Sequence, residues 1–198
     1  CYCYAAEIEG GRRTEDYYAF FRDGTEFRHV IMAERPNGDF AHTILRQFFF
    51  AAYMNPFWRA MTGSVDRQLA AHAGKAVKET AYHIRHCGEW VIRLGDGTEE
   101  SACRMATALD DLAPYIGEMF ETDETASRLI MAGVLPDPAP VRAAFEDTVA
   151  QTFAMATMPP FEVKAGISGG RNGRHTEVLG HLLAEMQQMQ RAYPGLKW

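Results

Sequence analysis

The chain has 198 residues, of which 47% are hydrophobic and 23% are charged, and its 26 acidic side chains outnumber the 20 basic ones. The formal net charge of -6 argues against a duplex nucleic-acid binder, because such proteins usually carry a basic surplus. The longest apolar run, Phe48–Met54, is much shorter than the roughly 20 residues of a membrane span. The length fits one domain with a sizeable core, over residues 1–198.

The first residues look like part of a larger element. Cys1–Cys3 begins the chain without a methionine, a capping residue or a targeting pattern, and the segment resembles the last turns of a helix. We therefore expect the bundle to lack one or two N-terminal helices in this chain. The four cysteines form no C-x-x-C pair, which favours reduced cytosolic thiols over a structural zinc site.

Helical periodicity dominates the rest of the chain. Apolar residues recur at spacings of three and four, which predicts helices over residues 17–34, 40–61, 66–93, 98–120, 140–156 and 174–191. Asp39, Asp66 and Thr98 stand where N-caps of three of these helices belong. Pro114 is a candidate kink, and residues 158–173 form a long irregular stretch. The pattern predicts an all-α fold, an antiparallel bundle of long helices.

A glycine-rich loop precedes the last predicted helix. Gly166–Thr176 reads GISGGRNGRHT and combines a flexible backbone with arginines and a helix start, where anions bind readily. The loop matches neither the P-loop nor the dinucleotide-binding spacing, and no strand precedes it. Two interpretations stay open. The loop caps the helix and locks onto the bundle, or Arg171, Arg174 and His175 contact an anionic ligand or a partner subunit.

Two helical pairs come close to the ligand pattern of a diiron bundle: Glu79 with His83, and Glu177 with His181. Diiron bundles use Glu-x-x-His, whereas both pairs here are spaced by four, with Tyr82 and Gly180 in the histidine positions. The predicted helix over residues 40–61 offers no carboxylate beyond its cap. We expect no metal, cofactor or catalytic residue in this chain. The alternative is a stand-alone ferritin-like diiron oxidase or oxygenase that uses all four side chains.

Several long blocks resemble one protein family. Glu34–Thr43 reads ERPNGDFAHT, Trp90–Ser101 reads WVIRLGDGTEES, and Gly173–Glu177 reads GRHTE after the SGGR of Ser168–Arg171. These blocks, together with Lys78–His86 and the segment that ends in AYPG, are similar to the C-subunit (PaaC) family of bacterial phenylacetyl-CoA epoxidases. The resemblance spans almost the whole chain.

The resemblance implies a ferritin-like fold and a structural, metal-free subunit that is not catalytic by itself. Members of this family pair with a homologous A subunit that carries the diiron centre, binds phenylacetyl-CoA and converts its ring to the 1,2-epoxide in aerobic phenylacetate breakdown. Electrons come from NADPH through a flavin and iron-sulfur reductase, and a small further subunit completes the complex. We accordingly expect a cytoplasmic hetero-oligomer, with a homodimer as the state of the chain alone. Extra N-terminal helices in the family would explain the absent methionine.

Overall fold

A computed structural model describes residues 1–11 and 13–196, and these residues contain helices and loops but no strand. The chain folds as two compact units. One unit is Pro36–Ile167, and the other combines Cys1–Arg35 with the segment that begins at Ser168. Each unit has buried apolar side chains of its own. The predicted all-α fold is confirmed, and the single domain over residues 1–198 stays a prediction.

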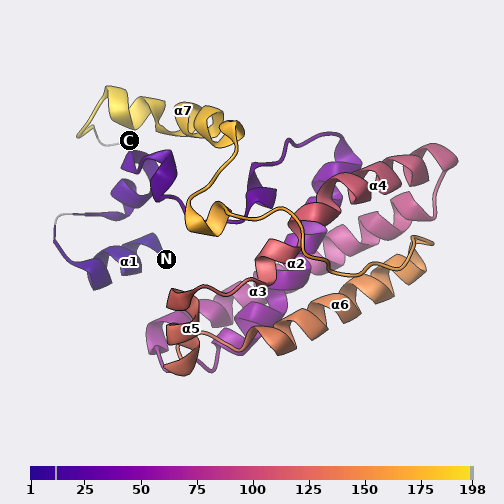
Figure 1. Cartoon of the computed structure of the whole chain (residues 1–198), viewed down its shortest axis with the longest axis horizontal. Helices are drawn as coiled ribbons and strands as arrows, with labels where there is room; N and C mark the ends of the chain where they lie inside the picture. The colour runs from indigo at the N-terminus through magenta and orange to yellow at the C-terminus, as the bar shows by residue number, and fades with distance from the viewer. Residues whose placement is uncertain (12, 197–198) are drawn as a thin grey trace. The chain divides into compact units, whose positions relative to one another are not determined.

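The unit Pro36–Ile167 is a helical bundle. Its helices are α2 (Phe40–Met61), α3 (Arg67–Gly95), α4 (Glu99–Leu112), α5 (Glu124–Met131) and α6 (Pro138–Met155). Helix α2 packs against α3, α4 and α6 (Figure 1). The predicted caps are confirmed, since Asp39, Asp66 and Thr98 each accept a hydrogen bond from a backbone amide in the first turn of the following helix.

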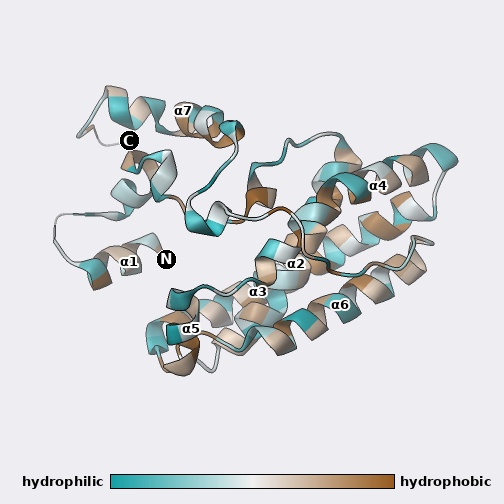
Figure 2. Ribbon diagram, in the orientation of Figure 1, coloured by the Kyte–Doolittle hydropathy of each residue, from teal (hydrophilic) through white to brown (hydrophobic). Residues whose placement is uncertain are grey.

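Aromatic side chains fill the interior of this bundle. Phe48 and Phe49 of α2 are fully buried. The Phe49 ring centroid lies 6.1 Å from those of Phe145 and Phe153 on α6, and 5.6 Å from that of Phe161. Buried aromatic pairs at such distances contribute strongly to core stability. Figure 2 shows polar and apolar residues alternating along α4, as expected of a helix that buries one face.

A buried amide joins α2 to α3. Asn55 Nδ2 donates to the Val77 carbonyl at 3.1 Å and to Thr80 Oγ1 at 3.0 Å. Its Oδ1 accepts from Arg59 Nε at 2.9 Å. A satisfied polar network of this kind fixes one relative register of the two helices, because any shift leaves buried groups unpaired.

The other unit is built from short elements and one longer helix. It contains α1 (Tyr2–Glu9), a π-helical turn (Tyr17–Phe21), 3-10 turns (Gly24–Glu26, Ile31–Glu34, Gly170–Asn172) and α7 (Glu177–Ala192). Phe27 packs with Leu179 and Leu183 of α7 in a small buried cluster. Gln187 Nε2 donates to the Arg22 carbonyl at 2.9 Å, which adds a buried polar tie.

Two predicted helices are wrong in their extent. Residues 17–34 form only short turns, because the backbone is extended at Arg22 and Phe27 and so cannot continue a helix. The helix predicted over residues 98–120 ends at Leu112, and 3-10 turns follow from Ala113 to Phe120. Pro114 lacks the amide that the next helical turn requires, which explains this break. Helix α5 is an element that we did not predict.

The last helix begins later than its periodicity predicts. Residues 174–191 were the predicted range, whereas α7 starts at Glu177 and Thr176 is its N-cap. The residues before it belong to the glycine-rich loop, whose backbone at Gly169 and Gly173 has positive φ values of 129° and 78°. Positive φ interrupts a right-handed helix, so these glycines set the start of α7.

Candidate functional site

The glycine-rich loop packs tightly against the segment that contains residues 25–31. A Cβ atom at Gly170 would collide with the His29 carbonyl. Gly173 has a φ of 78°, and a Cβ there would lie 2.9 Å from the Thr25 carbonyl oxygen. Only glycine fits such close backbone approaches without strain. This geometry supports the interpretation in which the loop locks onto the fold.

The carboxylate of Glu34 is the centre of this contact. Glu34 is 2% exposed, and its Oε1 lies 2.5 Å from His175 Nδ1 and 2.9 Å from His29 Nε2. Its Oε2 accepts hydrogen bonds from the backbone amide and the hydroxyl of Thr176, both at 2.7 Å. We call His29, Glu34 and His175 the junction cluster. It joins two stretches of chain that are about 140 residues apart in sequence.

The surroundings of the junction cluster fix the two imidazole rings. His175 Nε2 lies 3.0 Å from the Phe27 carbonyl oxygen, to which it donates. The His29 and His175 rings stack with centroids 4.5 Å apart. Burial by itself would raise the pKa of Glu34, but hydrogen bonds from Thr176 and His175 outweigh it and lower that pKa. Glu34 is therefore a carboxylate at neutral pH.

The junction cluster has the donor chemistry of a metal site. One ligand atom from each of its three residues lies within 4.8 Å of the other two. Among the described residues, this is the cluster of three histidine, cysteine or acidic side chains that could hold a metal ion. Sequence reasoning missed His29 and Glu34. Glu34 and His175 both lie in blocks that carry the family resemblance, but no local spacing links them, so only the folded chain brings them together.

The predicted contact residues of the loop divide into two environments. Arg174 is exposed, and it lines a hollow of about 510 Å³ together with Thr25, His175 and Thr176. Arg171 is partly buried. The side chain of His175 is only 6% exposed and both of its ring nitrogens have partners within the chain. Of the three, Arg174 is therefore the side chain best placed for an outside ligand.

The four side chains of the diiron alternative come from different units. Glu79, which is exposed, and His83, which is partly buried, lie on α3 of the bundle. Glu177 and His181 are both exposed and lie on α7. Within the described bundle Pro36–Ile167, Glu118 is the buried charged side chain, and no histidine is buried.

A charged network ties the start of α2 to α4. The two ring nitrogens of His42 face carboxylates, with Nδ1 2.8 Å from Asp39 Oδ1 and Nε2 3.0 Å from Asp111 Oδ2. Arg104 NH1 donates to Asp39 Oδ2 at 3.1 Å. The hydrogen bonds from His42 lower the pKa of Asp39 to about 2, and the bond to Asp39 raises the pKa of His42. The arrangement suits a structural clasp, since carboxylates occupy both ring nitrogens.

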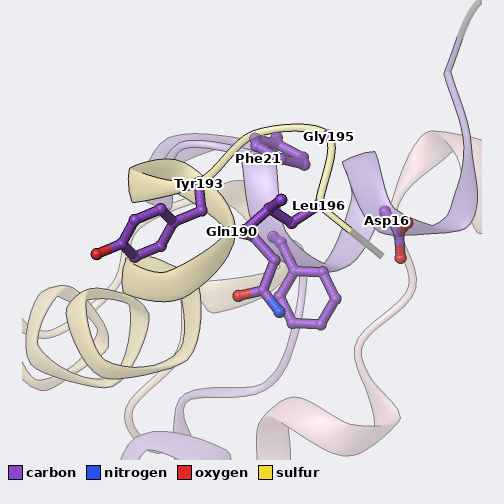
Figure 3. Close-up of a pocket in the computed structure, with 7 residues that line it drawn as sticks. Asp16, Phe21, Gln190, Tyr193, Gly195 and Leu196 are labelled. Atoms are coloured by element: carbon purple, nitrogen blue, oxygen red, sulfur yellow. The ribbon is translucent and has the colours of Figure 1, made fainter. Parts of the chain in front are cut away.

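A further hollow, of about 580 Å³, lies beside the end of α7 (Figure 3). The residues that line it are Asp16, Phe20, Phe21, Gln190, Tyr193, Gly195 and Leu196. Among the described residues its walls combine aromatic, aliphatic and polar side chains, and Asp16 is the charged one.

The fold and these sites define an all-helical bundle protein with a second, loop-rich unit, in which the buried carboxylate of Glu34 joins the two chain segments. Comparison with known proteins makes this class specific. The chain belongs to the phenylacetic acid catabolic protein family, whose profile it matches over residues 1–198. A relative from Escherichia coli (strain K12), named as the C subunit of 1,2-phenylacetyl-CoA epoxidase, is 42% identical over 195 residues, or 98% of this chain and 78% of the relative.

These comparisons confirm the resemblance that the sequence blocks indicated. The ferritin-like helical bundle that the resemblance implies is confirmed as well. No helix of the described residues has the length and apolar character that crossing a membrane requires.

Proposed function

We propose that this chain is a structural subunit of a multicomponent ring-1,2-phenylacetyl-CoA epoxidase and orders a homologous diiron catalytic subunit. The observation that carries the proposal is the 42% identity, across 98% of the chain, to a protein named as the C subunit of that epoxidase. In this assignment the diiron centre, the substrate site and the NADPH-dependent flavin and iron-sulfur reductase belong to other subunits of a cytoplasmic complex. The chain itself contributes no oxygen-activating iron.

The donor set of the bundle supports this division of labour. A diiron centre takes carboxylates and histidines that project from four helices into the bundle interior. Here the fully buried side chains of α2 include Leu45, Phe48 and Phe49, which cannot ligate a metal. Glu79, the nearest match to a ligand on α3, is exposed to solvent. Apolar buried side chains on α2 and an exposed carboxylate on α3 do not supply the buried ligands that an iron site needs.

The loop arginines are the proposed contact with the rest of the complex. Arg174 is exposed beside a hollow, and a guanidinium pairs strongly with carboxylates and phosphates. We propose that Arg174, with Arg171 beside it, binds an acidic surface of the catalytic subunit or the phosphates of its CoA substrate. His175 serves this contact indirectly, because it holds the loop in place through Glu34.

The decisive experiment combines reconstitution with iron analysis. The chain is purified alone and together with the homologous diiron subunit, and epoxidation of phenylacetyl-CoA is measured with reductase and NADPH. We expect the two proteins to co-purify, with iron and activity only when the catalytic subunit is present. The double variant Glu79→Ala/His83→Ala should leave both unchanged, and so should Glu177→Ala/His181→Ala, which removes the other candidate pair.

The alternative, a stand-alone diiron enzyme, predicts the opposite result. It requires the chain alone to take up close to stoichiometric iron and to lose it in Glu79→Ala/His83→Ala. That result would overturn the structural role. Failure of the chain to co-purify with the catalytic subunit, with both proteins folded, would remove the scaffold proposal by a separate route.

A further inference from the structure

We infer that the junction cluster of His29, Glu34 and His175 binds a single divalent transition-metal cation of the Zn²⁺ type. The site is mononuclear, lies in the unit that contains α7, and uses none of the residues of the diiron pattern. It is independent of the proposed structural role, since a chain without oxygen-activating iron can still hold a structural cation.

The orientation of His175 is the first argument. A carbonyl oxygen can only accept, so the 3.0 Å contact with the Phe27 carbonyl places the hydrogen of the neutral imidazole on Nε2. The hydrogen bond to Glu34 Oε1, 2.5 Å away, requires a proton on Nδ1, whereas a cation would take the place of that proton and bind the Nδ1 lone pair. A metal-bound histidine commonly donates its other N–H to a backbone carbonyl, which fixes the ring and its tautomer.

The orientation of Glu34 is the second argument. Two donors from Thr176 occupy Oε2, so the carboxylate is held with Oε1 toward the two rings. Oε1 also lies 2.9 Å from Nε2 of His29, so two ring nitrogens converge on one oxygen. Each of these two contacts is made either by a proton, as a hydrogen bond, or by a cation bound between the same atoms.

A cation fits with a small adjustment. Zn²⁺ binds nitrogen and oxygen ligands at roughly 2.0–2.2 Å in tetrahedral geometry, which sets ligand atoms about 3.4 Å apart. The separations of 2.5 and 2.9 Å would each open by no more than about 1 Å, which side-chain rotation can supply. The His29 side chain is 28% exposed, so one side of the site is open to solvent for a fourth, water ligand.

The donor set also selects the class of metal. Two imidazoles and one carboxylate favour Zn²⁺ and its first-row neighbours over Mg²⁺ or Ca²⁺, which prefer sites made of oxygen alone. A bound cation would tie residues 29 and 34 to residue 175 and thereby fix the start of α7. Such a cation stabilises the folded state by mass action, and the stabilisation grows with the logarithm of the ratio of its free concentration to its dissociation constant.

The test uses the full chain, freed of metal by EDTA and titrated with Co²⁺ alone. We expect one Co²⁺ per chain with the visible d–d absorption of a tetrahedral site, stoichiometric displacement by Zn²⁺, and a Tm increase of roughly 5–11 °C at a Zn²⁺ concentration 100 times its Kd. His29→Gln and His175→Gln should each weaken binding at least about tenfold. His181→Gln, which changes an exposed histidine on α7, is the matched control and should bind normally.

Two results would overturn the inference. One is the absence of saturable Co²⁺ or Zn²⁺ binding by the folded wild-type chain, which would mean that protons alone join the cluster. The other is binding that survives in both His29→Gln and His175→Gln. Glu34→Gln leaves one acceptor oxygen in place of two and so also disturbs the contact with Thr176. The partly exposed His29 is therefore the more informative position, and circular dichroism verifies that its variant is folded. Iron content and epoxidation test the structural role separately.

Discussion

The network at the start of α2 predicts a stability that depends on pH. Asp39 both caps α2 through the His42 amide and faces the His42 ring. Its side chain also accepts from Arg104 of α4. Because both ring nitrogens of His42 lie against carboxylates, the protonated ring is the form that the fold favours. Loss of either charge should therefore loosen the contact between α2 and α4.

Asp39 sets the lower limit and His42 the upper limit of the pH range in which this network is stable. Hydrogen bonds from His42 lower the pKa of Asp39 from 3.8 to about 2, so its contribution is complete above pH 3.8 and is lost as the pH falls through about 2. The hydrogen bond to Asp39 raises the pKa of His42 above 6.5, so its contribution is complete below pH 6.5 and is lost as the pH rises through the raised value. The network is strongest between these limits.

The magnitude follows from the cap and the charge together. A pKa lowered from 3.8 to about 2 corresponds to about 2.4 kcal/mol, which we reduce to about 1 kcal/mol because Asp39 is 29% and Arg104 55% exposed to solvent. Loss of an N-cap costs about 1 kcal/mol more. Asp39→Asn keeps an acceptor and should lower Tm by about 2–4 °C, whereas Asp39→Ala should lower it by about 4–8 °C.

Thermal unfolding followed by circular dichroism across a range of pH tests this reasoning. Wild type should lose stability as the pH rises above 6.5, and His42→Gln should flatten that decline. His86→Gln, an exposed histidine on α3, is the matched control and should keep the wild-type profile. An unchanged alkaline decline in His42→Gln would refute the assignment of the pH dependence to this network. Equal Tm values for Asp39→Asn and Asp39→Ala would refute the separate contribution of the cap.

Other positions give predictions of different kinds. Phe49→Ala removes a fully buried ring that packs against α6 and should cost about 3–5 kcal/mol of unfolding free energy in urea titrations. Gly170→Ala collides with the His29 carbonyl and should speed amide hydrogen exchange at the start of α7. Arg171→Glu/Arg174→Glu should weaken co-purification with the catalytic subunit or raise the KM for the CoA substrate, and unchanged values would leave the loop a structural cap. Burial raises the pKa of the Cys87 thiol, so it should resist alkylation until the protein unfolds, whereas exposed Cys103 reacts in the native state.

The bundle helices could be predicted because local signals agree with the tertiary packing. Helix α2 was predicted from residue 40 to 61 and found there, since Asp39 caps its start and Gly63 follows its end. The segment 17–34 has similar apolar content, but Gly24 and the extended residues around it divide the chain into short turns. Its apolar residues make tertiary contacts, such as that of Phe27 with Leu179 and Leu183 of α7. The spacing of apolar residues along the sequence does not predict contacts of this kind.

The candidate site was only half visible in the sequence for a similar reason. The loop glycines and His175 stood out locally, whereas His29 and Glu34 became relevant only through a contact between residues 141 positions apart. The sequence blocks contained Glu34 without any sign of its role, because a buried carboxylate is defined by its partners and not by its neighbours in the chain. The sequence also predicted that His175 contacts an outside ligand, because it does not show that the ring is nearly buried in the folded chain.

Two carboxylates flank the point at which the chain passes from one unit to the other. Glu34 lies just before the boundary at Arg35 and Pro36, and its partners are His29, His175 and Thr176. Asp39 lies just after it, and its side chain pairs with His42 and Arg104. Because these two partner sets do not overlap, the metal site and the pH-dependent network of Asp39 and His42 can be tested independently of each other. Glu34→Gln should abolish Co²⁺ binding and keep the pH profile of the bundle, whereas Asp39→Asn should do the reverse.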